Sequence, residues 1–222
     1  EINRGVVPLT SVDAGYMVND TLGYIKINRF AESTYTEFKS KMKQFSTPQM
    51  KSVILDLRSN GGGFLKQATL ILDEFIADGK LLLFTKNKNG DLNETFSSER
   101  GEYENQNLIV FIDEKSASAS EIVAGAIQDN DRGWIIGRRS FGKGLVQEPV
   151  KFDDGSALRL TVARYYTPAG RCIQKPYEDG PEEYYDDITE RFKHGELMEA
   201  DSINFADSLK YKTENGRTVY GG

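Results

Sequence analysis

Residues 108–128 read LIVFIDEKSASASEIVAGAIQ, in which a strand-like segment runs into a helix through a turn of small residues. Leu108–Ile112 is an uninterrupted apolar run of strand length. From Ser118 onward, Ile122, Val123, Ala126 and Ile127 fall on one face of a helix. This stretch predicts one strand–turn–helix unit of a layered α/β fold.

The same unit recurs on either side of this stretch. Val53–Leu55 is a short apolar strand that ends in DLRSNGGG (56–63), and a helix with Leu70, Ile71, Phe75 and Ile76 follows. Three more segments fit the pattern, namely a strand at 23–27, a helix at 34–45 and a strand at 134–136. Residues 145–152 and 157–166 alternate around a turn at 153–156, and residues 81–85 and 94–97 flank Asn89-Gly90. We therefore expect strand–helix repeats with an added antiparallel hairpin.

The composition excludes several classes of function. The 222 residues include 28 basic and 34 acidic side chains, a net charge of −6, which argues against nucleic-acid binding. One cysteine (Cys172) and one histidine (His194) allow neither an internal disulfide nor a zinc site of the usual ligands. We expect no metal and no cofactor. No apolar run reaches the length of about 20 residues that spans a bilayer.

An acidic run occupies residues 178–190 and contains Glu178, Asp179, Glu182, Glu183, Asp186, Asp187 and Glu190. Such a run predicts a solvated surface loop, and a cation-binding site is the lesser alternative. Residues 1–22 mix short apolar pieces with glycine and proline, which indicates a leader remnant of an upstream region. Tyr220-Gly221-Gly222 does not resemble a natural C-terminus. We therefore expect a catalytic core at 23–222 that is truncated at its C-terminal end.

Ser118 and Lys143 are the candidate nucleophile and base. Ser118 opens a predicted helix, where exposed amides and the helix dipole favour a nucleophile. Ser118 and Glu121 also fit a capping box, a structural alternative. Lys143 stands between two glycines, which would let the backbone close around its amine, although a loop lysine is ordinarily just solvated. Because His194 lies in a polar stretch far from Ser118, lysine is the better candidate base.

The glycine-rich strings invite a nucleotide-binding interpretation that the sequence does not support. GRRSFGK (137–143) nearly matches a phosphate loop, but Gly144 stands where Mg²⁺ binding needs Ser or Thr. An alternating strand with Pro149 follows, so no helix N-terminus is available for phosphates. NGGG (60–63) lacks the spacing of a dinucleotide fingerprint, but a glycine there can offer an amide to an oxyanion.

Three strings together, DLRSNGGG (56–63), SASASEI (116–122) and GRRSFGKGLVQ (137–147), resemble the carboxyl-terminal processing peptidases, serine endopeptidases with a Ser/Lys dyad. The resemblance runs from about Gly23 to Thr167. It implies that Ser118 is the nucleophile, Lys143 the general base and Gln147 the residue that orients the lysine. It also implies an oxyanion hole built from the backbone amides of Ala119 and of Gly62 or Gly63.

The resemblance carries further expectations. The family's core is similar to the spiral crotonase and Clp-protease α/β fold, and a PDZ-type domain would precede or interrupt it. Protein or peptide substrates would be cut near their C-termini outside the cytoplasm, by a protein that is periplasmic or is membrane-anchored and faces the periplasm. The sequence leaves oligomerisation open. Direct contact between Gln147 and Lys143 requires a bend at Gly144, because four extended residues span about 13 Å. A catalytically silent, protease-like peptide-binding or scaffold protein remains the alternative.

Overall fold

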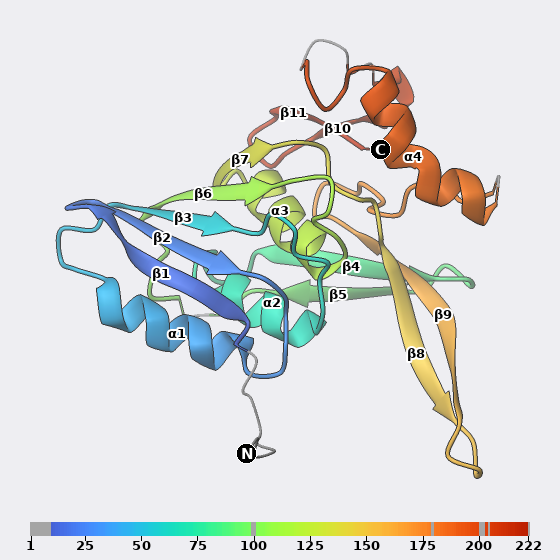
Figure 1. The fold of residues 1–222 in the computed structure, drawn as a ribbon, viewed down its shortest axis with the longest axis horizontal. Helices are drawn as coiled ribbons and strands as arrows, with labels where there is room; N and C mark the ends of the chain where they lie inside the picture. Colours follow the sequence, from blue (N-terminus) through green and yellow to red (C-terminus); the bar gives the residue numbers. More distant parts are fainter. Residues whose placement is uncertain (1–9, 99–100, 179, 200–202, 204, 222) are drawn as a thin grey trace, which may run out of the picture.

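The computed structural model describes residues 10–98, 101–178, 180–199, 203 and 205–221. Residues 1–9 of the expected leader remnant, Asp179 of the acidic run and Gly222 lie outside them. In chain order the strands and helices (Figure 1) are β1 (Val12–Asn19), β2 (Leu22–Ile27), α1 (Thr34–Phe45), β3 (Ser52–Asp56), α2 (Leu65–Asp73), β4 (Leu81–Asn87), β5 (Leu92–Phe96), β6 (Asn107–Ile112), α3 (Ala119–Asp129), β7 (Gly133–Gly137), β8 (Leu145–Lys151), β9 (Ala157–Tyr166), α4 (Pro181–Lys193), the 3₁₀ turn η2 (Asp207–Leu209), β10 (Lys210–Lys212) and β11 (Thr218–Tyr220).

The main sheet has five strands in the order β1-β2-β3-β6-β7. Strands β2, β3, β6 and β7 run parallel, as strands joined by crossover helices do, and β1 pairs antiparallel with β2. Strand β1 lies within residues 1–22, which the sequence pattern set apart from the core, and it forms an edge of this sheet. Its alternation is interrupted by register shifts on both sides of Ala14–Met17, so the sequence pattern did not reveal a strand.

Helices α1, α2 and α3 lie on one face of this sheet (Figure 1), and they bury its inward-facing side chains. Val53 and Leu55 of β3 and Leu108 and Val110 of β6 are at most 1% exposed. The intervening Ile54 and Ile109 are only partly buried on the other face. The apolar strands predicted at 53–55 and 108–112 are thus confirmed as core strands.

A second sheet, β5-β4-β9-β8, is antiparallel throughout, and α3 contacts strands of both sheets. The hairpin predicted at 145–152 and 157–166 is confirmed as β8 and β9, which project from the body of the molecule (Figure 1). The fold is α/β with mixed sheets, as the sequence predicted. The helix predicted at 34–45 is confirmed with the same bounds.

The prediction of a loop for the acidic run is wrong, because helix α4 spans residues 181–193. Pro181 occupies the first turn, where its missing N–H costs nothing, and Glu182 and Glu183 lie at the positive end of the helix dipole. Arg191 and Lys193 lie in the last turn. The charge distribution therefore suits a helix, and the acidic composition alone concealed it. Among the described residues, no helix has the length and hydropathy to cross a membrane.

Phe38 of α1 tests the core between α1 and α2. Its ring is fully buried and meets Phe75 and Tyr103 edge-on, with centroids 5.9 and 6.5 Å away. Phe38→Ala should lower the free energy of unfolding by about 3–5 kcal/mol in urea titrations, because it leaves a cavity. Phe152→Ala, at a half-exposed ring, should change it by less than about 1 kcal/mol. Equal effects of the two changes would contradict this packing.

Candidate active site

Ser118 lies in the turn between β6 and α3 with a strained backbone. Its φ of 55° and ψ of −113° are unusual for a residue with a side chain. Such strain costs energy and concentrates at functional sites. The side chain is half-buried, at the N-terminus of α3, where the helix dipole is positive. A strand–turn–helix placement of this kind presents a serine hydroxyl outward.

The glycine turn after β3 touches this serine turn directly. Gly62 has a φ of 95°, and a Cβ placed on it would lie 2.7 Å from both Ser118 Cβ and Ala117 O. Only glycine therefore fits at position 62. Gly63 is also confined, since its Cβ would collide with Phe30 O. By contrast, a Cβ on Gly61 would meet nothing within 4 Å.

Asn60 is buried completely and joins the two turns. Its amide nitrogen donates to Ile27 O at 3.0 Å, and its Oδ1 accepts from Gly62 N at 2.9 Å. Its backbone oxygen accepts from Ala117 N at 3.0 Å and from Ser120 Oγ at 2.9 Å. The glycine turn and the serine turn are therefore held as one unit.

Of the predicted oxyanion-hole amides, that of Gly62 already donates a hydrogen bond within the protein, and the other two do not among the described residues. Gly62 N donates to Asn60 Oδ1. Neither Ala119 N nor Gly63 N donates to any acceptor in the described part of the chain. Ala119 N lies 3.0 Å from the position that a Cβ on Gly62 would take, so the turn that carries Ser118 brings this amide close to Gly62. The pairing of Ala119 with Gly63 therefore needs no hydrogen bond to be broken.

Glu121 connects the turn that carries Ser118, between β6 and α3, to the loop that carries Lys143, which we call the lysine loop (residues 138–144). This carboxylate is 5% exposed. Its Oε2 accepts from both Ser118 N and Lys143 N at 2.8 Å, and its Oε1 accepts from Gly142 N at 2.6 Å and Ser140 Oγ at 2.7 Å. The backbones of Ser118 and Lys143, 25 positions apart in sequence, thus lie within two hydrogen-bond lengths of each other. Burial raises the pKa of the Glu121 carboxyl, and the four donated hydrogen bonds only partly offset this.

The side chains of Lys143 and Gln147 are exposed. The Lys143 amine makes no hydrogen bond to Ser118 or to Gln147 among the described contacts, so the structure joins Ser118 and Lys143 through their backbones alone. Gly144 is buried against Ile173 and Gln174, and β8 begins with the next residue. Gln147 lies on this strand, paired with Thr161 of β9.

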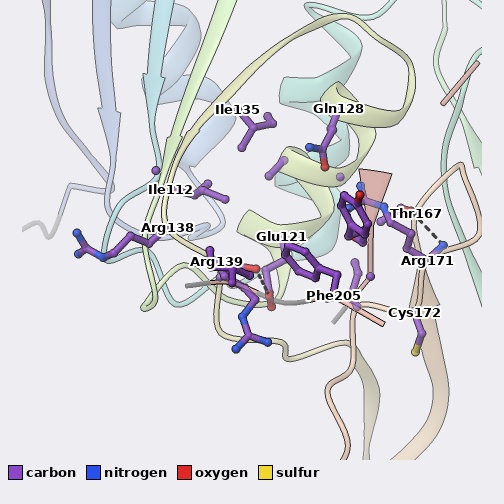
Figure 2. A pocket seen from close by; sticks show the side chains of 18 residues that line it. Ile112, Glu121, Gln128, Ile135, Arg138, Arg139, Thr167, Arg171, Cys172 and Phe205 are labelled. Carbon is purple, nitrogen blue, oxygen red and sulfur yellow. Dashed lines mark hydrogen bonds between the residues drawn. The ribbon is translucent and has the colours of Figure 1, made fainter. Parts of the chain in front are cut away.

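A cavity of about 290 Å³ borders Glu121 beside α3 (Figure 2). Its walls come from α3, from Ile112 and Ile135 of the main sheet, and from the C-terminal segment that carries Phe205. Arg171, which pairs with the buried Asp129, also lines it. Neither Ser118 nor Lys143 reaches it, so this cavity lies behind the Glu121 carboxylate and is not the predicted reaction site.

Sequence reasoning gave no role to a charged cluster at the end of β3, which we call the Asp56 cluster (Tyr24, Lys26, Asp56 and Arg58). Asp56 is 1% exposed and accepts from Arg58 Nη2 at 2.6 Å and Tyr24 Oη at 2.7 Å. Burial alone would raise its pKa, but hydrogen bonds from Arg58 and Tyr24 lower the pKa of Asp56 to about 2. The cluster borders a cavity of about 720 Å³ on the sheet face away from α1–α3. An Asp directly after an apolar strand was the available signal.

A serine on a strained strand-to-helix turn, tied to a lysine loop, is an arrangement suited to serine-type hydrolysis. The chain belongs to Peptidase family S41, whose model matches residues 21–180. A carboxy-terminal-processing protease of Bartonella bacilliformis is 39% identical over 179 residues, which cover 78% of this chain and 41% of that protein. The carboxy-terminal processing protease CtpA of Bacillus subtilis is 34% identical over 174 residues, covering 78% of this chain and 37% of that protein.

Solved structures agree with this assignment. The photosystem II D1 C-terminal processing protease superposes with a TM-score of 0.68 at 29% identity, over 76% of this chain and 46% of that one. An S41 protease from Bacteroides fragilis, at 16% identity and a TM-score of 0.64, shares the fold. The family resemblance drawn from the three motifs is confirmed. The chain spans about two fifths of the length of the curated relatives it matches.

The contact between the glycine and serine turns can be tested with two neighbouring glycines. Gly62→Ala should lower the free energy of unfolding by about 1–3 kcal/mol, because alanine is strained at this φ and meets Ser118 Cβ. Gly61→Ala, where a Cβ meets nothing, should be neutral within about 1 kcal/mol. Urea titrations of both variants give the comparison. If Gly62→Ala is as stable as Gly61→Ala, the two turns are not in contact as described.

The Asp56 cluster predicts a pH-dependent term in stability. The pKa of Asp56 is lower in the folded protein, so its contribution is present above the unfolded value and is lost as the pH falls toward about 2. The difference in unfolding free energy between wild type and Asp56→Asn should therefore shrink by about 2 kcal/mol from pH 6 to pH 2. Urea titrations across this range measure it. A difference that does not change with pH would contradict the assigned ion pair.

Proposed function

We propose that this chain carries the catalytic centre of a serine endopeptidase that cleaves proteins or peptides near their C-termini with a Ser118/Lys143 dyad. The observation that carries the proposal is the Glu121 carboxylate, which holds the backbone of both residues through one oxygen atom. Nothing in a simple helix cap requires the second of these bonds. The strained backbone of Ser118 and the family membership support the same assignment.

In the proposed reaction, Ser118 Oγ attacks the carbonyl carbon of the scissile peptide bond while neutral Lys143 Nζ takes the hydroxyl proton. The carbonyl oxygen becomes an oxyanion that accepts from Ala119 N and from Gly63 N, or from Gly62 N once that amide releases Asn60. Lys143 then gives its proton to the leaving amine as the C–N bond breaks. A water molecule then gives a proton to the same amine as it attacks the resulting ester, and the amine returns that proton to Ser118 Oγ as the ester C–O bond breaks.

The exposed position of Lys143 describes the protein without substrate. A peptide lying over the lysine loop would displace water from the amine, and removal of water disfavours the charged ammonium form. Gln147, on β8 four residues along, would orient the amine, an assignment that the family resemblance supports. Because Gly144 lies in the loop just before β8, it is the position at which the chain can bend to bring Lys143 and Gln147 together.

The family also supports several wider assignments for the whole protein. We propose an upstream PDZ-type region that binds the substrate's C-terminus, a spiral core of the crotonase and Clp-protease kind, and a location outside the cytoplasm. The alternative function is a protein that binds peptides without cutting them. The observation that favours this alternative is the exposed Lys143 side chain, with no hydrogen bond to Ser118 in the described structure.

A fluorophosphonate probe separates the two functions, because only an activated serine reacts with it. The full-length protein should be labelled at Ser118, as located by mass spectrometry of the digested product, and should cleave a peptide with a free C-terminus. Ser118→Ala and Lys143→Ala should each lower kcat by more than about 10³-fold, since the nucleophile or its base is lost. The rate of wild-type cleavage should rise from acidic toward alkaline pH as the base loses its proton.

Lys115→Ala is the matched control, because Lys115 is another exposed lysine close to Ser118 in the sequence. It should retain wild-type kcat. Thermal unfolding of every variant should show a folded protein at the assay temperature. Undiminished cleavage by folded Ser118→Ala protein would overturn the assignment, and wild-type protein that binds peptide without labelling or cleavage would support the silent alternative.

A further inference from the structure

Helix α4 lies beyond residues 21–180, the part of the chain that matches the family model, and yet it holds the loop that carries Lys143. This loop (residues 138–144) runs from the end of β7 to the start of β8. It contains Gly142 and Gly144, so its own conformational preferences restrain it weakly. Its geometry must therefore come from contacts with neighbouring elements.

Arg191, in the last turn of α4, makes the most direct of these contacts. Its side chain is only 4% exposed, unlike that of an ordinary surface arginine. Nη2 donates to Arg139 O at 2.6 Å, and Nη1 donates to Ser140 O at 3.1 Å. The fixed fork of the guanidinium thus fixes two consecutive carbonyls of the loop, three residues before Lys143.

Glu196 links the side chains of Arg191 and Arg139, so that the three residues form one closed hydrogen-bond network. It accepts from Arg191 Nε at 2.8 Å and, with both carboxylate oxygens, from the Arg139 side chain at 2.8 Å. Burial alone would raise the pKa of Glu196, but the two arginines lower it below its usual value. The backbone of Arg139 is therefore bound to α4 itself, and its side chain is bound to the segment that follows α4.

A second contact joins α4 to the middle of the loop. Lys175 Nζ lies 4.5 Å from the ring centroid of Phe141 and 4.2 Å from that of Tyr184 in α4. It donates to Tyr184 O at 2.7 Å, and the backbone N of Lys175 donates to Gly142 O at 3.0 Å. The Phe141 and Tyr184 rings meet edge-on. Helix α4 therefore touches the loop at residues 139–141, on the N-terminal side of the lysine.

We propose that Arg191 is a positioning residue for catalysis, and that α4 sets the place of the Lys143 amine relative to Ser118 by holding the carbonyls of residues 139 and 140. The inference rests on the proposed peptidase function and adds to it an element outside the family match. A misplacement of about 1 Å at a reacting group can cost about 100-fold in rate, so the loop does not have to unfold for activity to fall.

The test compares Arg191→Gln with Lys193→Gln in the full-length protein. Both changes remove one positive charge from the last turn of α4, but Lys193 is exposed and pairs only with Glu190 among the described residues. Arg191→Gln should lower kcat by about 10- to 100-fold with KM changed by less than about threefold, because ground-state binding is left intact. Lys193→Gln should keep wild-type kcat and KM.

The pH dependence of Ser118 labelling by the fluorophosphonate distinguishes positioning from simple loss of folded protein. A smaller folded fraction lowers labelling equally at every pH. A released Lys143 amine instead moves the rise in labelling rate to higher pH, which we expect for Arg191→Gln. Arg191→Lys should restore only part of the rate, since an ammonium lacks the planar fork.

If Arg191→Gln does not fold, Glu196→Gln takes its place, because it keeps the shape of the side chain while weakening the hydrogen bonds of residue 196 to Arg191 and Arg139. It should show the same pH shift with a smaller loss in kcat. Wild-type kcat and an unchanged pH profile in the folded Arg191 variant, or in Glu196→Gln if that variant replaces it, would overturn the inference while leaving the peptidase function standing. Wild-type protein that is neither labelled nor active would overturn both.

Discussion

The geometry of the site depends on one buried carboxylate. Glu121 brings a strand-to-helix turn and a loop from a later part of the chain to a common point, and it does so mainly by accepting from backbone amides. Removing a carboxylate from water is costly, and hydrogen bonds to a charged acceptor, worth about 1.5–3 kcal/mol each, offset that cost. Because three of the four donors are main-chain groups, the position of Lys143 relative to Ser118 is fixed at the level of the backbone.

A second buried network complements the first with the opposite charge. Glu121 accepts from the amides of residues 142 and 143, whereas Arg191 donates to the carbonyls of residues 139 and 140. The lysine loop is thus held between an anion that takes its N–H groups and a cation that takes its C=O groups. Each ion satisfies polar groups that a glycine-containing loop could not pair internally. The two networks come from α3 and α4, which are far apart in sequence.

The features that could be predicted from the sequence are those that depend on residues close together in the chain. Apolar runs and periodicity placed the core strands, α1 and the β8–β9 hairpin, and the capping-box pattern found the bond from Ser118 N to Glu121. The other three bonds of Glu121 join residues about 20 positions apart, and no local rule encodes them. The acidic composition of α4 concealed its helix signals, and the burial of Arg191 depends on tertiary packing alone. Residue types and spacing named Ser118 and Lys143 as candidates, and the family resemblance supplied the proposed role of Gln147, which the strand pattern alone could not.

In the site, hydrogen bonds hold the backbone of Ser118 and Lys143, whereas the Lys143 side chain makes no hydrogen bond to Ser118 among the described contacts. Ser118 is held in a strained conformation, and the strain is offset by hydrogen bonds from its own N–H and from that of Ala117. Among the described residues the amide of Ala119 has no acceptor, and it lies close to the turn that carries Gly62. The Lys143 amine, by contrast, remains in water. In the proposed reaction only the Lys143 side chain has to move toward Ser118 Oγ, because Glu121 already holds the backbone of both residues.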